Sequence, residues 1–156
     1  GVYEAPLGVT VRRLLTAAGG VPGGSQPGAV LLGGAAGRFL GAEQLDVPLG
    51  HRPPSLPVGS GAVVVFDAST DFAEIVTRIA AFFRDESCGQ CVPCRIGTVR
   101  QHEALGRLAA GSDEGMLLAQ IGVVMRDASI CGLGQLAFDA VESALELGLI
   151  GGRSDG

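Results

Sequence analysis

The sequence predicts an α+β fold, in which a small unit of short strands is followed by four helices that carry a cysteine site. Three observations predict this fold. Over residues 1–68, short apolar runs alternate with Gly and Pro, which is typical of strands and turns. Over residues 69–148, apolar residues recur at helical spacing. All four cysteines lie in this second part of the chain.

The first part is expected to hold one helix among its strands. Thr10 can cap a helix that ends at Gly19 and Gly20, because a Thr hydroxyl accepts from free N–H groups and Gly lets the chain turn. Residues 19–28 are predicted to form a loop. Strands are expected over residues 2–5, 29–32 and 62–66, with a further strand or extended edge over residues 45–49.

The strand over residues 62–66 is continuously apolar, so we expect it to be buried. Pro53, Pro54 and Pro57 are interpreted as a linker before this strand. A strand, a helix and further strands in this order resemble a β-grasp module of the soluble ligand-binding type. We therefore expect residues 1–68 to form such a module.

Residues 69–156 are predicted to form a helical domain, a bundle of four helices with one apolar face each. Asp71 and Glu74 resemble a capping box at the start of the first helix, and Ser112 can cap the third. The second helix is expected over residues 95–110, and the fourth ends near Gly148. The predicted inward residues, helix by helix, are Phe72, Ile75, Val76, Ile79, Phe82 and Phe83; Ile96, Val99, Leu105 and Leu108; Leu117, Leu118, Ile121, Val124 and Met125; and Leu136, Ala137, Ala140, Val141, Ala144 and Leu145.

The cysteines are the strongest chemical signal in the chain. Cys88, Cys91 and Cys94 stand at C-x2-C-x2-C spacing, and Cys131 follows after 36 intervening residues. A [4Fe–4S] cluster needs one thiolate at each of its irons, and two residues between ligands let a tight loop aim three thiols at one cluster. Cys131 is the only cysteine left for the fourth iron. The sequence thus predicts a cluster at one end of the bundle, held between the first and the last helix junctions.

Zinc and disulfide bonds are the alternatives for these cysteines. Structural zinc usually takes two separated C-x2-C pairs, whereas the spacing here is three plus one. Disulfides suit short secreted chains, and the sequence shows neither a secretory signal nor scattered cysteines. The zinc alternative implies another class of function, in which the β-grasp module binds a ligand or a partner and the metal is structural.

The residues around the cysteines closely resemble one family. ESCGQCVPCRIGT and SICGLGQLA, with GVYEAPLGVTVRRLL near the start, are similar to the NADH-binding flavoprotein subunit of respiratory complex I. They are also similar to its diaphorase-type relatives in NAD-dependent formate dehydrogenases and NAD(P)-linked hydrogenases. The resemblance implies that Cys88, Cys91, Cys94 and Cys131 hold a [4Fe–4S] cluster, which passes electrons from NADH-reduced FMN to the next redox centre. It further implies that FMN and NAD bind to a preceding domain, so we assign no catalytic residue in this chain.

Charge and composition limit the partners. The net charge is −5 and no apolar run is long enough to cross a bilayer, so neither a nucleic-acid partner nor membrane insertion is expected. The resemblance implies other subunits of a multi-subunit oxidoreductase, including an adjacent iron–sulfur subunit, in the cytoplasm or on the cytoplasmic face of a membrane complex. The motifs CRIGT and CGLGQLA favour the diaphorase-type relatives. Gly1 in place of Met predicts an internal or C-terminal piece of a longer protein.

Four residues beside the cysteines are expected to tune the cluster. Gly89, Gly132 and Gly134 allow backbone N–H groups to approach its sulfurs. The Arg95 guanidinium would favour the reduced, more anionic form, although an ordinary solvated charge is the alternative. GLGQLA also matches the dinucleotide motif G-x-G-x-x-A, but that motif needs a preceding strand and a βαβ unit. Helices and a ligand cysteine are expected there, so we assign no nucleotide site.

Overall fold

The computed structural model describes residues 1–21 and 26–152, and it has the expected α+β composition. It divides into two compact units. The sheet unit comprises Gly1–Gly34 and Phe39–Thr70, and the helical unit comprises Ala35–Arg38 and the chain from Asp71 onward. No helix in the described ranges is long and apolar enough to cross a membrane.

A three-stranded sheet forms the sheet unit's framework. The strands β1 (Ala29–Leu32), β2 (Arg38–Leu40) and β3 (Val63–Phe66) lie in the order β2-β1-β3, and β1 runs antiparallel to β3. Two short 3-10 helices, η2 (Gly34–Ala36) and η3 (Ala42–Asp46), flank β2 in the chain. Strand β1 is therefore central, which agrees with the burial of all four of its residues.

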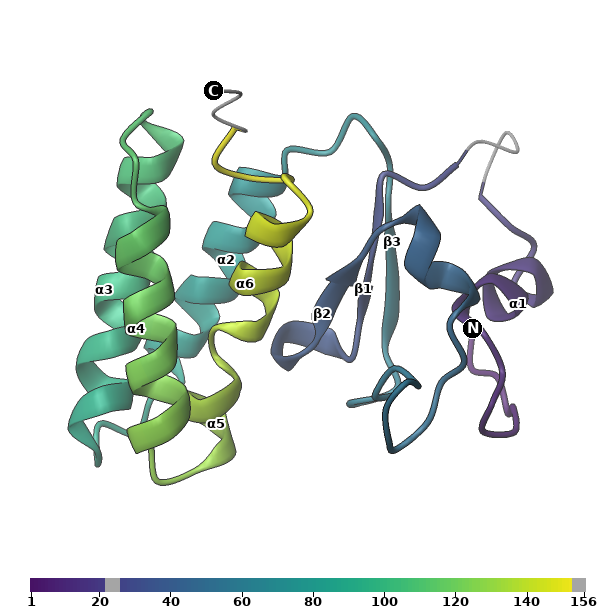
Figure 1. The fold of residues 1–156 in the computed structure, drawn as a ribbon, viewed down its shortest axis with the longest axis horizontal. Coiled ribbons are helices and arrows are strands. Elements are labelled where there is room, and N and C mark those ends of the chain that lie inside the picture. The colour runs from purple at the N-terminus through teal and green to yellow at the C-terminus, as the bar shows by residue number, and fades with distance from the viewer. Residues whose placement is uncertain (22–25, 153–156) are drawn as a thin grey trace. The chain divides into compact units, whose positions relative to one another are not determined.

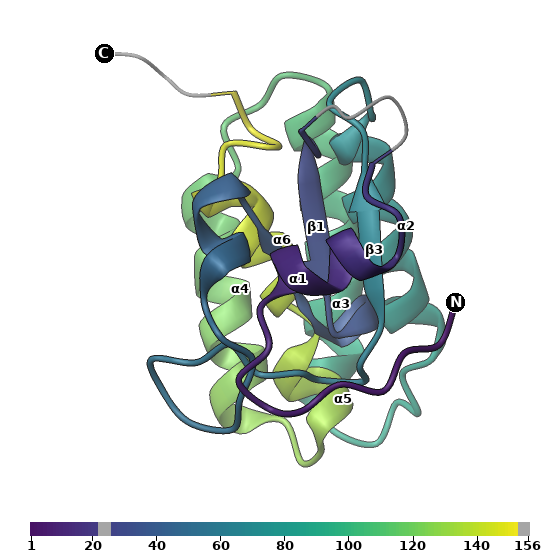
Figure 2. The same ribbon diagram turned by 90° about the vertical axis from the view of Figure 1, so that its right-hand side faces the viewer.

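One helix, α1 (Val11–Ala17), crosses a face of this sheet (Figure 2). As predicted, the Thr10 hydroxyl caps α1 by accepting a hydrogen bond from the Arg13 backbone N–H at 3.3 Å. Gly19 and Gly20 follow with φ of 99° and 76°. This left-handed region is costly for residues with a Cβ, so the two glycines explain where the helix stops.

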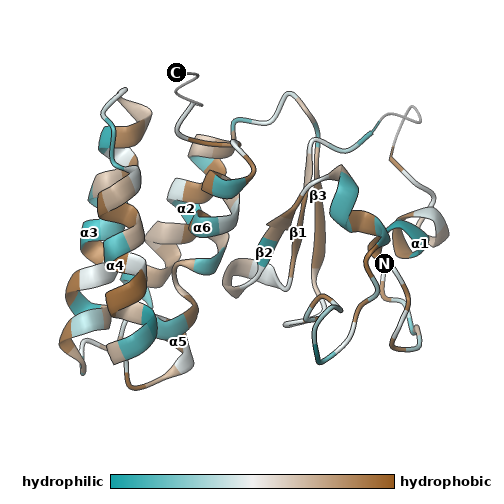
Figure 3. Ribbon diagram, in the orientation of Figure 1, coloured by the Kyte–Doolittle hydropathy of each residue, from teal (hydrophilic) through white to brown (hydrophobic). Residues whose placement is uncertain are grey.

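Aliphatic side chains form the core of the sheet unit. Figure 3 shows β1 and β3 in the brown of hydrophobic residues. The core draws on α1, β1, β2, η3 and the segment after η3, and its buried members are Val11, Val30, Leu32, Leu40, Leu45 and Leu49. Each is at most 5% exposed, so hydrophobic burial is the main force that holds this unit together.

Three predictions for the sheet unit differ from the structure. Residues 2–5 form no strand, because that exposed segment pairs with no neighbour in the sheet. Of the strand or extended edge expected over residues 45–49, η3 takes the first part up to Asp46, while Pro48 and Leu49 form single bridges with Thr10 and Leu56. Strand β3 lies at the edge of the sheet, so Val64 and Val65 are 42% and 38% exposed instead of buried.

The loops of the sheet unit also differ from expectation. The proline segment expected as a linker lies within the sheet unit, where Leu49 and Leu56 form a bridge across its base. The backbone hydrogen bond from the Gly50 N–H to the Leu56 carbonyl, at 2.8 Å, closes the same loop. Of the loop predicted over residues 19–28, residues 22–25 lie outside the described residues.

Four helices pack side by side in the helical unit (Figure 1): α2 (Phe72–Asp85), α3 (Val92–Ala109), α4 (Gly115–Ala128) and α6 (Asp139–Glu146). A short helix, α5 (Gly132–Leu136), lies at one end of this bundle. The capping residue of α2 is Asp71 as predicted, since its carboxylate accepts from the Glu74 backbone N–H at 3.1 Å. The predicted bundle is thus present.

The last predicted helix is broken into α5 and α6, and close packing explains the break. Phe138 lies between these two helices and is only 3% exposed. Its ring packs against Gly122 of α4, where an added Cβ would stand 2.5 Å from ring carbons. Gly97 of α3 similarly faces Met125 of α4, whose Sδ would lie 2.6 Å from an added Cβ. Glycine lets backbone and side chains meet here at distances that no larger residue allows.

Six apolar side chains that were predicted to face inward are exposed instead. They are Phe82, Ile96, Val99, Leu117, Val124 and Leu136, with 36–55% of their surface accessible. On α3 the inward positions belong to Cys94, Thr98 and Gln101, each at most 5% exposed. The inward face near the cysteines is small and polar, so a rule that places apolar residues inward selects the wrong face. Helix α4 also begins after Glu114 and not at Ser112.

Candidate metal centre

The four cysteines lie at two junctions between helices. Cys88 is exposed in the loop after α2, and Cys91 is the residue that caps the N-terminus of α3. Cys94 lies in the first turn of α3 and is 5% exposed. Cys131 is exposed and caps the N-terminus of α5, where the chain arrives from α4. In Figure 1 both junctions lie at the same end of the bundle.

Cys91 lies at the first junction, and its thiol is influenced by backbone N–H groups of both junctions. The backbone N–H of Ile130 is the largest cause of a lowered pKa at Cys91, and the backbone N–H of Cys94 is the next. The Ser129 hydroxyl lowers this pKa further. Hydrogen bonds of this kind stabilise the thiolate, which is the form that binds metal. Because Ile130 precedes Cys131, the contact ties the first three cysteines to the fourth.

Cys94 shows that all four thiols share one electrostatic environment. Burial raises its pKa most, and the neighbouring charges of Cys91, Cys131 and Cys88 raise it further, while a hydrogen bond with Ser87 lowers it. Thiolates that influence one another in this way repel unless cations lie between them. The arrangement is therefore suited to a cationic group that the four sulfurs surround.

The cysteines are not arranged as the ligands of a single metal ion are. Among residues 1–21 and 26–152, no three His, Cys, Asp or Glu side chains gather closely enough to hold one metal ion. Two thiolates on a tetrahedral zinc lie about 3.8 Å apart, because Zn–S bonds measure about 2.3 Å. A cluster spreads its ligands over four irons, so its thiolates stand further apart.

Three of the predicted tuning residues have defined neighbours. The Arg95 guanidinium donates to the Gly89 carbonyl at 2.9 Å, and Gly89 adopts a φ of 74°. The Gly89 N–H points to the Ser87 hydroxyl oxygen at 3.4 Å. Gly134 is buried, and a Cβ there would stand 2.9 Å from the Cys94 Cβ. Close packing beneath Cys94 thus requires glycine at position 134.

Gly132 differs from Gly134 although both belong to the same short motif. It is exposed as the first residue of α5, and an added Cβ would meet only the Leu136 side chain, at 3.9 Å. The motif GLGQLA follows helix α4 and a ligand-type cysteine, and no strand precedes it within the described helical unit. The motif therefore lacks the strand that a dinucleotide site needs, as expected.

Sequence reasoning missed two serines at this site, Ser87 and Ser129. The Ser87 hydroxyl oxygen lies 3.3 Å from the Cys94 sulfur, and Ser129 is 7% exposed beside Cys91. Each stands one or two positions before a cysteine, but so common a residue carries little signal without its contacts. Only the fold shows that the Ser87 hydroxyl meets the Cys94 sulfur and that the Ser129 hydroxyl is buried beside the site.

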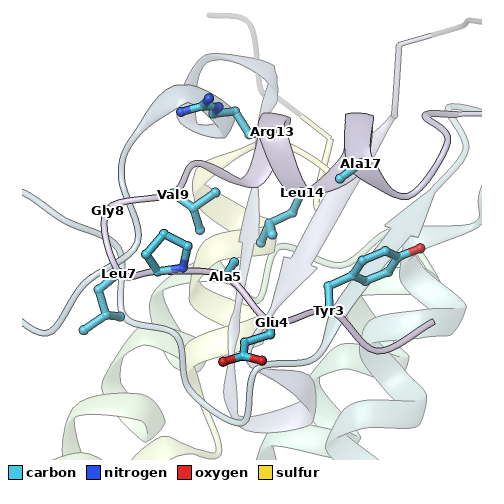
Figure 4. A pocket seen from close by; sticks show the side chains of 10 residues that line it. Tyr3, Glu4, Ala5, Leu7, Gly8, Val9, Arg13, Leu14 and Ala17 are labelled. Carbon is cyan, nitrogen blue, oxygen red and sulfur yellow. The ribbon is translucent and has the colours of Figure 1, made fainter.

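The sheet unit contains a second candidate, a hollow of about 490 Å³ between the N-terminal segment and α1 (Figure 4). Its lining combines apolar residues such as Leu7, Val9 and Leu14 with Glu4 and Arg13. In Figure 4 the Glu4 and Arg13 side chains lie on opposite sides of the hollow. Binding sites for small molecules usually place a few polar groups so that they converge, and this hollow does not.

A comparison with protein families finds a match over the part of the chain that holds the four cysteines. Residues 74–147 match the family model described as the NADH-ubiquinone oxidoreductase-F iron-sulfur binding region. These residues include all four cysteines and extend from α2 into α6. The cluster for which this family is named is of the [4Fe–4S] type.

Curated relatives match almost the whole chain. The F-type subunit of the NADH-quinone oxidoreductase of Aquifex aeolicus is 35% identical over 94% of the chain, which covers 34% of that protein. The corresponding protein of Mycobacterium tuberculosis is 38% identical over 94% of the chain and 34% of its own length. The NADP-reducing hydrogenase subunit HndC of Solidesulfovibrio fructosivorans is 31% identical, again over 94% of the chain and 31% of the relative. The chain thus spans about a third of the length of these relatives.

A solved structure is similar in fold as well as in sequence. The crystal structure of an NAD+-reducing [NiFe]-hydrogenase in its H2-reduced state matches with a TM-score of 0.82 and 38% identity. The match covers 94% of the chain and 25% of the hydrogenase chain.

Proposed function

We propose that the chain relays single electrons from FMN through a [4Fe–4S] cluster, because residues 74–147 match the family model of the NADH-ubiquinone oxidoreductase-F iron-sulfur binding region. The ligands are Cys88, Cys91, Cys94 and Cys131. The observation that carries the proposal is the close packing of Gly134 in α5 against Cys94 in α3, where an added Cβ would stand 2.9 Å from the Cys94 Cβ, because it brings the turn that holds the fourth cysteine beside the C-x2-C-x2-C loop.

The residues around the cysteines prepare them for this task. Backbone N–H groups at the start of α3 and beside Cys131 favour the thiolate form of Cys91. Helices α3 and α5 both begin at a cysteine, so their unpaired N–H groups surround the sulfurs with partial positive charge. When bound, the cluster supplies a centre that takes up and releases one electron at a time.

Solvent access differs among the four ligands. Cys94 is buried beneath the turn at Gly134, whereas Cys88 and Cys131 are exposed. The protein thus shields one side of the site from water and leaves the other side open. A partner that donates or accepts electrons can approach the open side without any change in the helices.

The proposal extends to the parts of the parent protein that lie outside these 156 residues. FMN and NAD bind elsewhere in the parent, and no hydride-transfer residue is assigned in this chain. Residues 1–68 serve as a β-grasp module and residues 69–156 as the cluster domain. Other subunits of a multi-subunit oxidoreductase, including an adjacent iron–sulfur subunit, are the partners. The complex works in the cytoplasm or on the cytoplasmic face of a membrane.

An anaerobic reduction experiment tests the relay. Hydride leaves NADH as two electrons, and a single [4Fe–4S] centre accepts one, so a flavin is needed between them. Dithionite is therefore expected to reduce the purified chain, with a low-temperature EPR signal, whereas NADH alone is not. A rapid, saturable signal from NADH without added flavin would contradict this division of labour. A colourless protein that carries zinc and no acid-labile sulfide would overturn the cluster itself.

A further inference from the structure

Ser129 is a buried hydroxyl without a full hydrogen bond. It is 7% exposed, and its Oγ finds no partner with hydrogen-bond geometry among the described residues. Its position is fixed, since its backbone N–H donates to the Met125 carbonyl at 3.2 Å as α4 ends. Its own carbonyl accepts from the Gln135 side chain at 3.0 Å. A buried hydroxyl that donates no hydrogen bond destabilises the fold. We therefore expect a group at this site that can accept its proton in a hydrogen bond.

The surroundings of this hydroxyl are the cysteine ligands. It packs against Gly134, where an added Cβ would stand 2.7 Å from the Ser129 Cβ and 2.9 Å from the Cys94 Cβ. The hydroxyl therefore lies beside Cys94 and the backbone of α5, where the two helix junctions meet.

Ser87 stands in a matching position on the opposite junction. Its Oγ lies 3.3 Å from the Cys94 sulfur and accepts from the Gly89 N–H at 3.4 Å. A thiolate carries no proton to give, so the hydroxyl must be the donor in the contact with Cys94. The Gly89 N–H on the oxygen leaves the Ser87 proton free for that sulfur.

We propose that the Ser87 hydroxyl donates an O–H···S hydrogen bond to the Cys94 thiolate, that the Ser129 hydroxyl donates one to a sulfur of the bound cluster, and that both bonds raise the reduction potential of the cluster. The inference rests on the proposed function, because it takes these cysteines as cluster ligands. A hydrogen bond to sulfur stabilises negative charge, and the reduced cluster is the more negative form. Hydrogen bonds and burial are established ways for a protein to tune such centres.

The test compares midpoint potentials of loaded protein variants by EPR-monitored redox titration. Ser129→Ala and Ser87→Ala are each expected to shift the midpoint to more negative values, and the double variant to shift it further. Ser129→Thr keeps the hydroxyl and should stay near the parent. Ser143→Ala is the matched control, because Ser143 is a buried serine of α6 that bonds to the Asp139 carbonyl at 2.8 Å.

A second readout follows the protons themselves. After exchange into deuterated buffer, electron–nuclear double resonance of the reduced parent should show exchangeable deuterons coupled to the cluster. The Ser129→Ala variant should lose one of these couplings, and Ser143→Ala should lose none. A purely structural role of Ser129 would alter iron content without this selective loss.

The possible results separate the two proposals. If the parent binds no iron–sulfur cluster, the proposed function fails. If the parent is loaded but both alanine variants keep its midpoint and its couplings, the serine inference fails while the proposed function stands. Should Ser129→Ala not retain a cluster, Ser87→Ala decides: a more negative midpoint supports the inference, and an unchanged midpoint overturns it.

Discussion

The sheet unit and the helical unit are stabilised in different ways. The sheet unit has an aliphatic core whose members, such as Val30 and Leu45, are fully enclosed by the unit's own elements. At the cysteine end of the helical unit, the inward positions are taken by Cys94, Thr98 and Gln101, and the Gln101 side-chain oxygen has no partner among the described residues. Hydrophobic burial accounts for the first unit. The helical unit also buries apolar side chains, such as Val76, Leu118 and Met125, so we expect what the cysteines bind to add stability mainly at its cysteine end.

Loss of one ligand should produce the largest difference between the units. Cys131→Ala removes the link between the two helix junctions. Because metal ligation contributes to the free energy of folding, its loss should destabilise the helices that it joins. We expect amide exchange in α3, α4 and α5 to accelerate by about a hundredfold or more, since each tenfold change requires only about 1.4 kcal/mol. The sheet unit should keep its protection. Equal protection of the helices in parent and variant, by hydrogen-exchange mass spectrometry, would contradict the comparison.

A core substitution in the sheet unit should destabilise that unit and leave the cysteine site unchanged. Leu45 is 1% exposed in the sheet-unit core, so Leu45→Ala is expected to destabilise that unit by about 2–5 kcal/mol through lost burial and a cavity. Iron content and the visible spectrum should stay the same. Leu7→Ala is the control, because Leu7 is 60% exposed and should change stability by less than about 0.5 kcal/mol. Denaturation followed separately in each unit measures both effects.

Two glycines of one motif offer a sharper test within the cysteine site. Gly134→Ala places a methyl group 2.9 Å from the Cys94 Cβ, and overpacking of this kind costs about 1–3 kcal/mol. We expect reduced iron content and a lower unfolding temperature. Gly132→Ala adds a methyl that meets only Leu136 at 3.9 Å, so it should load normally. Equal loading of the two variants would show that the packing beneath Cys94 does not matter.

The smallest effect should come from an ion pair at the start of α4. Glu114 accepts two hydrogen bonds from Arg107, at 2.6 and 3.0 Å, and these hold the pKa of Glu114 below its ordinary value. Such a pair stabilises the fold above the carboxyl's unfolded pKa, and the stabilisation is lost as pH falls through the lower folded pKa. Glu114→Gln should therefore lower the unfolding temperature near neutral pH, and the two proteins should converge in acid. Glu103→Gln, at an exposed pair with Arg100, should change little at either pH.

Local signals in the sequence predicted a good part of this fold. The caps at Thr10 and Asp71, the apolar strand at residues 29–32 and the cysteine spacing each depend on neighbours in the chain, and the structure confirms the helices and the strand among them. Long-range packing was harder to predict. Val64 and Val65 are exposed because β3 lies at a sheet edge, which depends on strand order and not on hydrophobicity.

The candidate site shows the same limit. The spacing of the four cysteines was visible in the sequence. The contact of Ser87 with Cys94 depends on the turn after α2, and Ser129 approaches Cys94 only because the two junctions meet at Gly134.

Ile96 and Val99 of α3 were predicted to face inward, but they are exposed. Thr98 and Gln101 are buried instead, and their side chains donate to the Cys94 and Ala137 carbonyls. A long-range hydrogen bond such as that of Gln101 cannot be recognised from hydrophobic spacing.

The most direct test of the central claim is the iron and acid-labile sulfide content of protein prepared without oxygen. If Cys88, Cys91, Cys94 and Cys131 hold one [4Fe–4S] cluster, the chain should carry about four irons and four sulfides, with a broad visible absorption band. Cys131→Ala should lose most of both, whereas Leu7→Ala should keep them. One zinc per chain with no labile sulfide, or an iron content unaffected by loss of Cys131, would contradict the account.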